Sequence, residues 1–464
     1  MRTILLTIVL ASTLCYAEDW PRFRGVNGSG VSDSTGLPIE FDPHKNVLWK
    51  TPLPFGRSSP VIAGNRIFLT ASESGKLITL CLDRASGKIQ WRREIVPPHT
   101  TPIYRANDPA SPTPATDGQN VYAFFADLGL VSYGPDGNER WRAPLGPFDT
   151  FYGLGGSPVY ANGTVVMLCD ARKKPFLVAV DAATGKVRWR VERKQTGYEG
   201  YSSPVIYEPA GQPSQVILGV ANRIEAYSLA TGEPVWWFRG LAYFPVASPV
   251  VNGDVLLATT WGADAPPGPS FDELLQKFDK NHDGKLSREE VKDSAEMYDM
   301  FGAFDMNNDG FYDRGEFDLM RNGAVGDYGL VAVKLGGRGD LTSSGFVWRE
   351  KKTYSSMSTP LAYGGIVYTI KDGGIIAALD ARTGESLKVG RSKEAMENYF
   401  ASPVAADGKV FFVTDQGKVS VVKAGREWEV LKVNDLNEEC FATPAIADNT
   451  IFIRTKSALY AFRQ

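Results

Sequence analysis

A Ser/Thr-Pro pair recurs eight times along this chain, and the repeat restricts the possible folds more than any other feature of the sequence. Apart from one interval of 111 residues, successive pairs lie 41 to 54 residues apart. Short runs of β-forming residues follow each pair, and units of about 40–45 residues with four strands are typical of propeller blades. We therefore expect an all-β protein, an eight-bladed β-propeller of four-stranded blades. The pairs are Ser59-Pro60, Thr113-Pro114, Ser157-Pro158, Ser203-Pro204, Ser248-Pro249, Thr359-Pro360, Ser402-Pro403 and Thr443-Pro444.

Two further positions recur within these units. The residue before each pair is small or compact, as at Gly156 and Ala401, which fits an innermost strand crowded against the central axis. A turn that ends in glycine is followed four residues later by tryptophan, which we expect to pack as a wedge between blades. Blade counts of seven or nine remain open, because the first interval is long and Lys388 replaces the tryptophan of the sixth unit. The pairs are Gly87 and Trp91, Gly137 and Trp141, Gly185 and Trp189, and Gly232 and Trp236.

The two ends of the chain are expected to close the ring together. The last unit, from Thr443 to Gln464, ends before its tryptophan strand. Residues 47–50 have the pattern of a strand with a tryptophan, Trp49, and no unit precedes them. Pairing these two segments would remove two exposed sheet edges at once. We therefore predict that residues 47–50 complete the eighth blade.

The repeats also resemble a known family. The unit from Ser157 to Trp189 starts with Ser-Pro-Val and ends with Asp-Ala-Ala-Thr-Gly-Lys-Val-Arg-Trp, which is similar to PQQ-like β-propeller repeats. That family includes quinoprotein dehydrogenases and the propeller lipoprotein of the outer-membrane β-barrel assembly machinery. The resemblance implies the propeller fold and says little about function. Residues 19–25, Asp-Trp-Pro-Arg-Phe-Arg-Gly, resemble the start of exported members, and no role is predicted for them.

The long interval indicates an insertion in the fifth blade. At 111 residues it is more than twice as long as any other interval between pairs. Loops of such length without structure of their own are uncommon in compact domains. We place the insertion at residues 264–326, between propeller segments 18–263 and 327–464.

The insertion is acidic and begins with a helix signal. Between Asp264 and Arg321 there are 15 acidic and 7 basic residues, a local charge of −8 in a chain with a net charge of −3. A proline-rich linker at residues 265–269 is followed by Ser270 and Glu273, the pattern of a capping box. We therefore expect a helix that leads into the acidic segment.

Two consecutive loops of the insertion, residues 279–290 and 305–316, have the EF-hand pattern. Ca²⁺ takes 6–8 oxygen ligands, and such a loop supplies them from alternating positions, with a glycine at the sharp turn and a bidentate glutamate at the end. Both loops match throughout, so we expect two Ca²⁺ ions per chain. The expected ligands are Asp279, Asn281, Asp283, the Lys285 carbonyl, Ser287 through water and Glu290, then Asp305, Asn307, Asp309, the Phe311 carbonyl, Asp313 and Glu316.

The resemblance to EF-hands extends to the way the loops pair. Leu286 and Tyr312 occupy the positions that join paired loops in a short β-bridge. The loops start only 26 residues apart and the helix after Glu316 is about two turns long, as in compact dockerin-like calcium modules. We therefore expect calcium to order the insertion locally, without the large opening of a calmodulin-like switch.

A ring of large side chains is expected at the mouth of the propeller, two positions before the Ser/Thr-Pro pairs. Such side chains can stack on a saccharide, a peptide or a planar cofactor. They can equally plug the channel and pack the blades. We expect a protein or saccharide ligand at this funnel. The residues are Arg57, Tyr201, Met357, Phe400 and Phe441, with Tyr152 and Phe244 nearby.

The chain offers little material for catalysis. Its three histidines, His44, His99 and His282, are isolated or stand at a non-ligand loop position, so neither a triad nor a zinc site is expected. The quinoprotein dehydrogenases of the resembling family carry adjacent cysteines over their cofactor, and no Cys-Cys occurs here, so PQQ is not expected. We therefore expect an exported interaction scaffold, and a PQQ-dependent periplasmic oxidoreductase is the alternative.

The first residues indicate an export signal. A short apolar run precedes Ala17, so residues 1–17 are predicted to be a cleaved signal peptide and the protein to be periplasmic or secreted. A lipoprotein anchor at Cys15 is the rival interpretation, against which the bulky Leu14 argues. No transmembrane segment and no nucleic-acid surface are expected from the hydropathy and charge. The remaining cysteines, expected as buried unpaired thiols in strands, are Cys81, Cys169 and Cys440.

Overall fold

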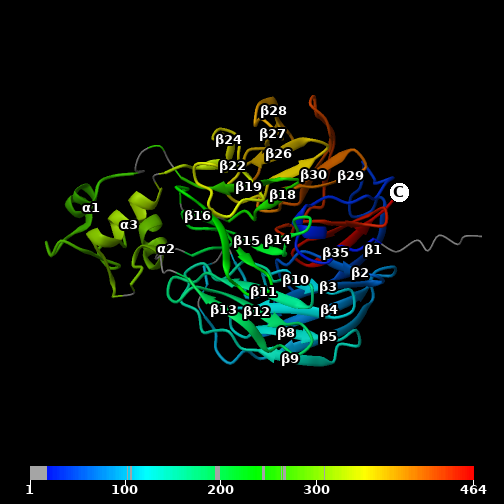
Figure 1. Ribbon diagram of the computed structural model, residues 1–464, viewed down its shortest axis with the longest axis horizontal. Helices are drawn as coiled ribbons and strands as arrows, with labels where there is room; N and C mark the ends of the chain where they lie inside the picture. Colours follow the sequence, from blue (N-terminus) through cyan, green and yellow to red (C-terminus); the bar gives the residue numbers. More distant parts are fainter. Residues whose placement is uncertain are drawn as a thin grey trace, which may run out of the picture.

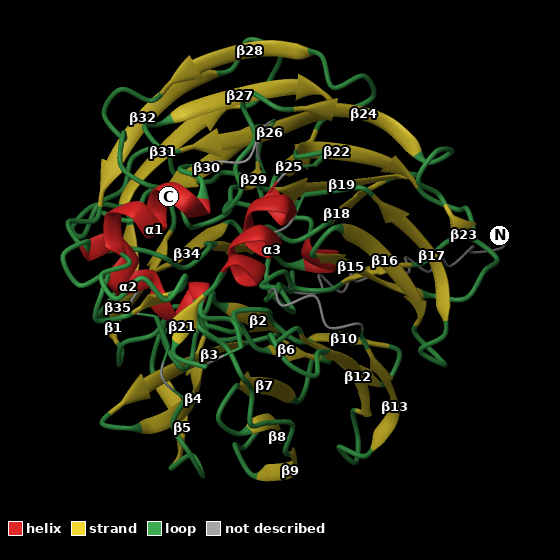
Figure 2. Ribbon diagram, turned by 90° about the vertical axis from the view of Figure 1, so that its left-hand side faces the viewer, coloured by secondary structure: helices red, strands yellow, loops and turns green. Residues whose placement is uncertain are grey.

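The insertion projects from one side of the ring (Figure 1), and eight β-sheets radiate from a central axis (Figure 2). The predicted eight-bladed propeller of four-stranded blades is confirmed. The computed structural model describes residues 18–101, 103–104, 107–193, 199–242, 246–262, 264, 268–307, 309–324 and 326–464. The predicted signal peptide (1–17), linker residues 265–267 and Phe244 lie outside the described residues.

Each blade is an antiparallel sheet whose strands follow one another from the axis outward. Blade 1 consists of β2 (Val61–Ala63), β3 (Arg66–Glu73), β4 (Lys76–Asp83) and β5 (Ile89–Ile95), and blade 2 of β6 (Ala115–Thr116), β7 (Val121–Phe125), β8 (Gly129–Tyr133) and β9 (Glu139–Ala143). Blade 3 consists of β10 (Val159–Ala161), β11 (Thr164–Cys169), β12 (Phe176–Asp181) and β13 (Val187–Glu192), and blade 4 of β14 (Val205–Tyr207), β15 (Gln215–Val220), β16 (Arg223–Ser228) and β17 (Pro234–Arg239).

Blade 5 contains the insertion between its second and third strands, and β23 of this blade adds a short parallel edge to blade 4. Blade 5 consists of β18 (Val250–Asn252), β19 (Val255–Thr260), β22 (Gly329–Lys334) and β24 (Phe346–Glu350), with the short β23 (Gly339–Asp340) between its last two strands in sequence. Blade 6 consists of β25 (Leu361–Tyr363), β26 (Ile366–Lys371), β27 (Ile375–Asp380) and β28 (Ser386–Arg391), and blade 7 of β29 (Val404–Ala406), β30 (Lys409–Val413), β31 (Lys418–Lys423) and β32 (Glu429–Asp435). Blade 8 consists of β33 (Ala445–Ala447), β34 (Thr450–Arg454), β35 (Ala458–Phe462) and β1 (Val47–Pro52).

Burial explains the apolar runs of the repeat. Every residue of β11 is buried, because neighbouring blades cover both faces of the middle strands. The outermost strands are more exposed, and in β13 only alternate residues are partly covered. The hydrophobic core is therefore a series of clusters between adjacent blades.

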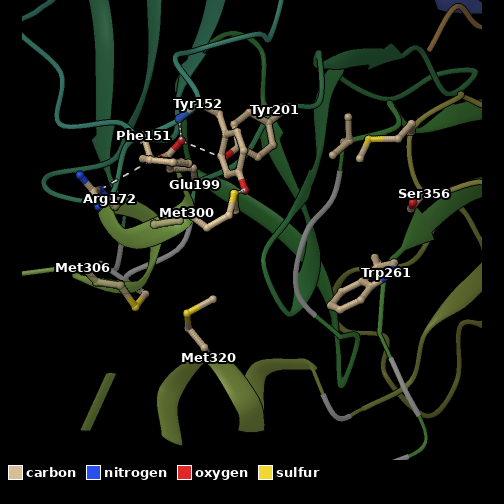
Figure 3. A pocket seen from close by; sticks show the side chains of 13 residues that line it. Phe151, Tyr152, Arg172, Glu199, Tyr201, Trp261, Met300, Met306, Met320 and Ser356 are labelled. Atoms are coloured by element: carbon tan, nitrogen blue, oxygen red, sulfur yellow. Dashed lines mark hydrogen bonds and ion pairs between the residues drawn. The ribbon is translucent and has the colours of Figure 1, made fainter. Parts of the chain in front are cut away.

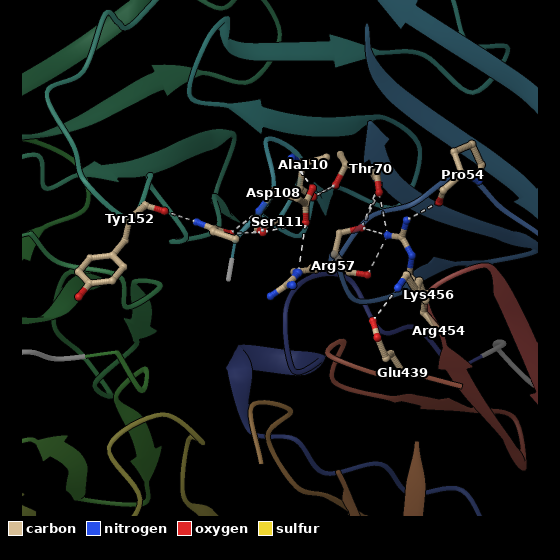
Figure 4. A network of polar contacts seen from close by, with 12 residues as sticks. Pro54, Arg57, Thr70, Asp108, Ala110, Ser111, Tyr152, Glu439, Arg454 and Lys456 are labelled. Atoms are coloured by element: carbon tan, nitrogen blue, oxygen red, sulfur yellow. Dashed lines mark hydrogen bonds and ion pairs between the residues drawn. The ribbon is translucent and has the colours of Figure 1, made fainter. Parts of the chain in front are cut away.

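The N-terminal strand closes the ring, as the sequence predicts. β1 pairs antiparallel with β35, with Trp49 opposite Ala461, and completes the sheet order β1-β35-β34-β33. Arg454 of β34 reinforces this closure, since its guanidinium donates to the carbonyls of Pro54 and Thr70 at 3.3 and 2.7 Å (Figure 4). Burial lowers the pKa of Arg454 to about 10.

Five tryptophans lie between blades, and each one covers the glycine of the following unit. A Cβ added to these glycines would lie 2.5–2.8 Å from an indole ring, and all five have φ between +71° and +79°. Each indole Nε1 also donates to a carbonyl of that following unit, at 2.9–3.2 Å. The contacts are Trp49 on Gly87, Trp91 on Gly137, Trp141 on Gly185, Trp189 on Gly232 and Trp348 on Gly384. The predicted wedge role is confirmed for Trp91, Trp141 and Trp189. Trp236, the fourth tryptophan of the predicted pattern, covers none of the described glycines, and its indole Nε1 instead donates to the Gln215 side chain of its own blade at 2.9 Å.

The eight Ser/Thr residues of the repeat form one closed ring of hydrogen bonds around the axis. The backbone N–H of each donates to the side-chain hydroxyl of the corresponding residue in the next blade, with N···O distances of 2.9–3.1 Å. The bond from Thr443 to Ser59 joins the last blade to the first. The repeat therefore satisfies a buried amide in every blade with a hydroxyl from its neighbour.

Residues 19–32, which we call the plug, cross the channel of the propeller. The plug bonds to blade 1 through Trp20 and Ile62 and to blade 7 through Val31 and Ala405. Arg24 is fully buried at its centre and donates to the carbonyls of Pro360 and Pro403, both at 3.0 Å. The motif for which the sequence predicts no role thus closes one end of the channel.

The insertion is a small helical unit on one face of the ring, and Figure 2 shows its helices in front of the central part of the propeller. Its elements are α1 (Phe271–Phe278), β20 (Leu286–Ser287), α2 (Ala295–Phe304), β21 (Phe311–Tyr312) and α3 (Arg314–Ala324). The predicted capping box is present, with the Ser270 side chain accepting from the Glu273 amide. None of the described helices is long and apolar enough to cross a membrane.

The three described cysteines are free and buried. Cys81 and Cys169 lie in β4 and β11, whereas Cys440 lies in the segment before β33, outside the strand expected for it. Burial raises the pKa of Cys81 and Cys440 to about 12, so these thiols remain protonated at neutral pH.

Candidate functional site: two acidic loops beside a funnel

The first loop, residues 279–290, is held in a tight turn by its own acidic side chains. Asp279 accepts from the amides of His282 and Gly284 at 2.7 and 3.0 Å. Glu290 reaches back across the loop and accepts from the amides of Lys280 and Ser287 at 3.1 and 2.8 Å. The two ends of the loop therefore converge on the same interior.

The second loop, residues 305–316, repeats this arrangement. Asp305 accepts from the Gly310 amide at 2.9 Å, and Glu316 accepts from the amides of Met306 and Asn307 at 2.7 and 3.0 Å. The turn glycines, Gly284 and Gly310, have φ of +81° and +90°, a region that other residues adopt only with strain. Asn308 lies outside the described residues.

The two loops pair back to back. β20 and β21 form a two-stranded antiparallel sheet in which Leu286 faces Tyr312, the pairing expected from the sequence. Both side chains enter a small core with Phe271, Phe301 and Phe317, which joins the three helices. The loops are thus held by a shared apolar core, as a paired EF-hand-type unit requires.

The chemistry of the loops suits a hard cation. Glu290, Asp305 and Glu316 are 7%, 7% and 8% exposed, and burial raises the pKa of Glu316. Among the residues that the structure describes, no three His, Cys, Asp or Glu side chains converge closely enough to hold a metal by themselves. EF-hand-type loops complete their shell with amide, carbonyl and water oxygens, which Asn281 and Asn307 begin to provide. The residues present therefore fit Ca²⁺ by the kind of donor and by the spacing of the donors along each loop.

A cavity of about 480 Å³, which we call the funnel cavity, occupies the open end of the channel. All eight Ser/Thr residues of the repeat line it, together with Phe23 of the plug. Six of the seven large residues expected at the mouth also line it, whereas the seventh, Phe244, lies outside the described residues. The six are Arg57, Tyr152, Tyr201, Met357, Phe400 and Phe441.

The walls of the funnel cavity are aromatic and carry one cation. The guanidinium of Arg57 stacks on Phe441, 3.9 Å from the centroid of its ring. The ring centroids of Phe441 and Phe400 are 5.5 Å apart. Arg57 also pairs with Asp108 at 4.0 Å (Figure 4). The funnel can therefore stack on a flat or apolar group and bond to its polar edges.

A second cavity, of about 290 Å³, lies where the insertion meets the funnel (Figure 3). We call it the junction cavity. Tyr152, Tyr201, Val246 and Met357 line both cavities, so the two spaces adjoin. The other lining residues are Phe151, Arg172, Glu199, Trp261, Met300, Ala303, Met306, Met320 and Ser356.

Blade 3 bonds to the second loop beside this cavity. Arg172 donates to the carbonyls of Gly302 and Asp305 at 2.7 and 3.4 Å, and Lys173 donates to the Asn307 carbonyl at 3.3 Å. The insertion is therefore fixed to the propeller through the first residues of a candidate calcium loop. The sequence analysis missed Arg172 and Lys173, because no repeat or motif marks them.

The sequence matches one family over most of its length. The model of that family, described as "Outer membrane protein assembly factor BamB", matches residues 31–169, 130–263 and 173–464. The chain belongs to this family. No curated protein matches the chain.

Solved structures show how widely this fold is used. BamB from Moraxella catarrhalis is 13% identical to this chain; the match covers 90% of this chain and 99% of that protein, with a TM-score of 0.57. A europium-containing methanol dehydrogenase is 10% identical, with 96% and 98% covered and a TM-score of 0.61. The computationally designed protein Ika8 is 12% identical, with 90% and 100% covered and a TM-score of 0.57. At these identities the likeness concerns the fold alone.

Proposed function

We propose that this protein is an exported, calcium-binding interaction scaffold that binds a partner at its funnel. Two Ca²⁺ ions per chain would occupy the loops 279–290 and 305–316. The observation that carries this proposal is the repeated geometry of the loops, in which the terminal glutamate returns to the amides at the start of its own loop.

The funnel supports the scaffold half of the proposal. Its cavity of about 480 Å³ combines aromatic walls with a ring of hydroxyls, the mixture that binding sites use for affinity and orientation. The plug closes the opposite end of the channel, so a ligand would enter from the side that bears the insertion. A protein ligand agrees with the family match, because the model of that family is described as a protein assembly factor. A saccharide is the second possibility, because the same aromatic walls can stack on a sugar ring.

The calcium half is tested by isothermal titration calorimetry on the mature chain. We expect two binding events, with dissociation constants on the order of 10⁻⁶ to 10⁻⁴ M. The double variant Glu290→Gln, Glu316→Gln should lose both, because each glutamate supplies two ligand oxygens. The double variant Asp293→Asn, Asp318→Asn removes the same charge outside the loops and should keep both. An unchanged stoichiometry in the glutamate variant would refute the assignment.

A PQQ-dependent oxidoreductase is not proposed. The sequence identity with the europium-containing methanol dehydrogenase is only 10%, so the likeness concerns the fold alone. The funnel residues instead offer stacking and hydrogen bonding, which suffice for a binding role.

A further inference from the structure

The junction cavity is unusually rich in methionine. Four of the eight methionines in the whole chain line it, and they come from both sides of the boundary. Met300, Met306 and Met320 belong to the insertion, whereas Met357 belongs to the funnel rim. Methionine is flexible and polarizable, and it is overused at surfaces that adapt to varied apolar groups. Phe151 and Trp261 add aromatic walls, and Trp261 faces the methionines across the cavity (Figure 3).

The polar residues of this cavity balance one another. Arg172 and Glu199 are the charged side chains among its lining residues, and they pair at 3.6 Å. Glu199 also accepts from the Tyr201 hydroxyl at 2.8 Å and from the Tyr152 amide at 3.3 Å. A charged ligand would therefore find no excess of opposite charge and would lose its hydration. The complementary occupant is uncharged and apolar.

The size of the cavity favours a side chain over a whole small molecule. Its volume of about 290 Å³ lies just below the range of about 300–1,000 Å³ that is typical for small-molecule sites. It adjoins the larger funnel cavity through Tyr152 and Met357. A polypeptide can place one bulky side chain in the junction cavity while its backbone continues over the hydroxyls of the funnel.

The second loop forms part of the cavity wall. The Met306 side chain lines the cavity, while the Met306 amide donates to the Glu316 carboxylate at 2.7 Å. Met320 lies one helical turn after Glu316, and Arg172 contacts the Asp305 carbonyl. A Ca²⁺ ion in this loop would draw in the carboxylates of Asp305 and Glu316 and carry these wall residues with them. Residues of the first loop do not line the cavity.

We propose that the junction cavity binds a bulky, uncharged apolar side chain of a polypeptide partner, and that calcium in the second loop strengthens this binding. The inference rests on the proposed function and deepens it, because it names the part of the partner that is recognised and the loop that controls it.

The test uses the mature chain and an uncharged fluorescent probe, N-phenyl-1-naphthylamine. We expect the probe to bind about tenfold more tightly with calcium than with chelator, a coupling in the usual range. Met300→Gln should weaken binding, whereas Met396→Gln, on an exposed methionine that does not line the cavity, should not. N-acetylphenylalaninamide should displace the probe, and N-acetylphenylalanine, with the same side chain and a carboxylate, should do so at least about tenfold less well.

The two loops provide matched controls. Glu316→Gln should abolish the calcium effect on the probe, whereas Glu290→Gln should retain most of it. Arg172→Met should leave two calcium events in calorimetry and reduce the calcium effect on the probe, because it cuts the contact between loop and blade.

Three results would overturn the inference. The first is an equal affinity for the probe with and without calcium. The second is that Glu290→Gln and Glu316→Gln change the calcium effect on the probe equally. The third is displacement of the probe by a fatty acid but not by N-acetylphenylalaninamide. If calorimetry still shows two calcium events in any of these cases, the calcium assignment survives and only the role of the cavity fails. If calorimetry shows none, the proposed function itself fails.

Discussion

Replacing Gly87 by alanine tests whether the tryptophan–glycine contacts stabilise the propeller. A Cβ on Gly87 would lie 2.5 Å from Cε3 of Trp49, closer than atoms in contact can approach. Gly64 provides the matched control, because it also has a positive φ, +53°, and a Cβ there would have no atom within 4 Å. Both variants strain the backbone, and only Gly87→Ala displaces an indole.

The expected cost follows from three contributions. Holding alanine at positive φ costs about 1–2 kcal/mol at either position. Forcing an extra methyl group against a packed ring costs about 1–3 kcal/mol. Moving Trp49 also weakens its hydrogen bond to the Arg84 carbonyl, which contributes about 1 kcal/mol. Gly87→Ala should therefore destabilise the protein by about 2–4 kcal/mol more than Gly64→Ala.

Guanidinium unfolding followed by far-ultraviolet circular dichroism measures the difference in stability between the two variants without depending on tryptophan fluorescence. The midpoint should fall clearly further for Gly87→Ala, with little change in slope. Equal midpoints for the two variants would show that the indole accommodates the methyl group, and the contact could not then be called stabilising.

Two further predictions concern closure and the insertion. Trp49→Ala should cost roughly 3–5 kcal/mol in the same unfolding assay, and a loss no larger than for an exposed residue such as Leu48→Ala would mean that β1 is dispensable. Chelation should expose residues 272–318 to limited proteolysis while the blades stay associated, because the local charge of −8 repels itself without calcium; cut sites spread over the blades would instead show that calcium holds the whole propeller together.

The sequence predicts the parts of this fold that local patterns encode. Each blade carries its own strands and turns within about 45 residues, so the repeat reveals the architecture. The closing strand could be predicted because residues 47–50 have a strand pattern and no partner nearby. The paired loops could be predicted because the residues of each EF-hand pattern lie within twelve residues of one another.

Contacts between distant segments could not be predicted in this way. Arg24 of the plug bonds to residues 335 to 379 positions away, and Arg172 bonds to Gly302 across 130 positions. The tryptophan–glycine pattern was visible in the sequence, yet Trp91, Trp141 and Trp189 each cover the glycine of the next unit and not their own. Such pairings depend on how the blades are placed around the axis, which no single segment encodes.

The position of the insertion has a consequence for how such proteins change over evolution. The chain leaves and re-enters the sheet at one facing pair, Thr260 and Gly329, and the strands on the propeller side keep their register. Each doubling of the length of a loop costs only about 0.6 kcal/mol in closure entropy. The turn of a hairpin can therefore accept a whole folded unit at a small cost in free energy. A propeller can thus acquire a new module by a single genetic insertion at one turn, without compensating changes in its eight blades. The same turn is a natural place to graft other folded domains beside the funnel.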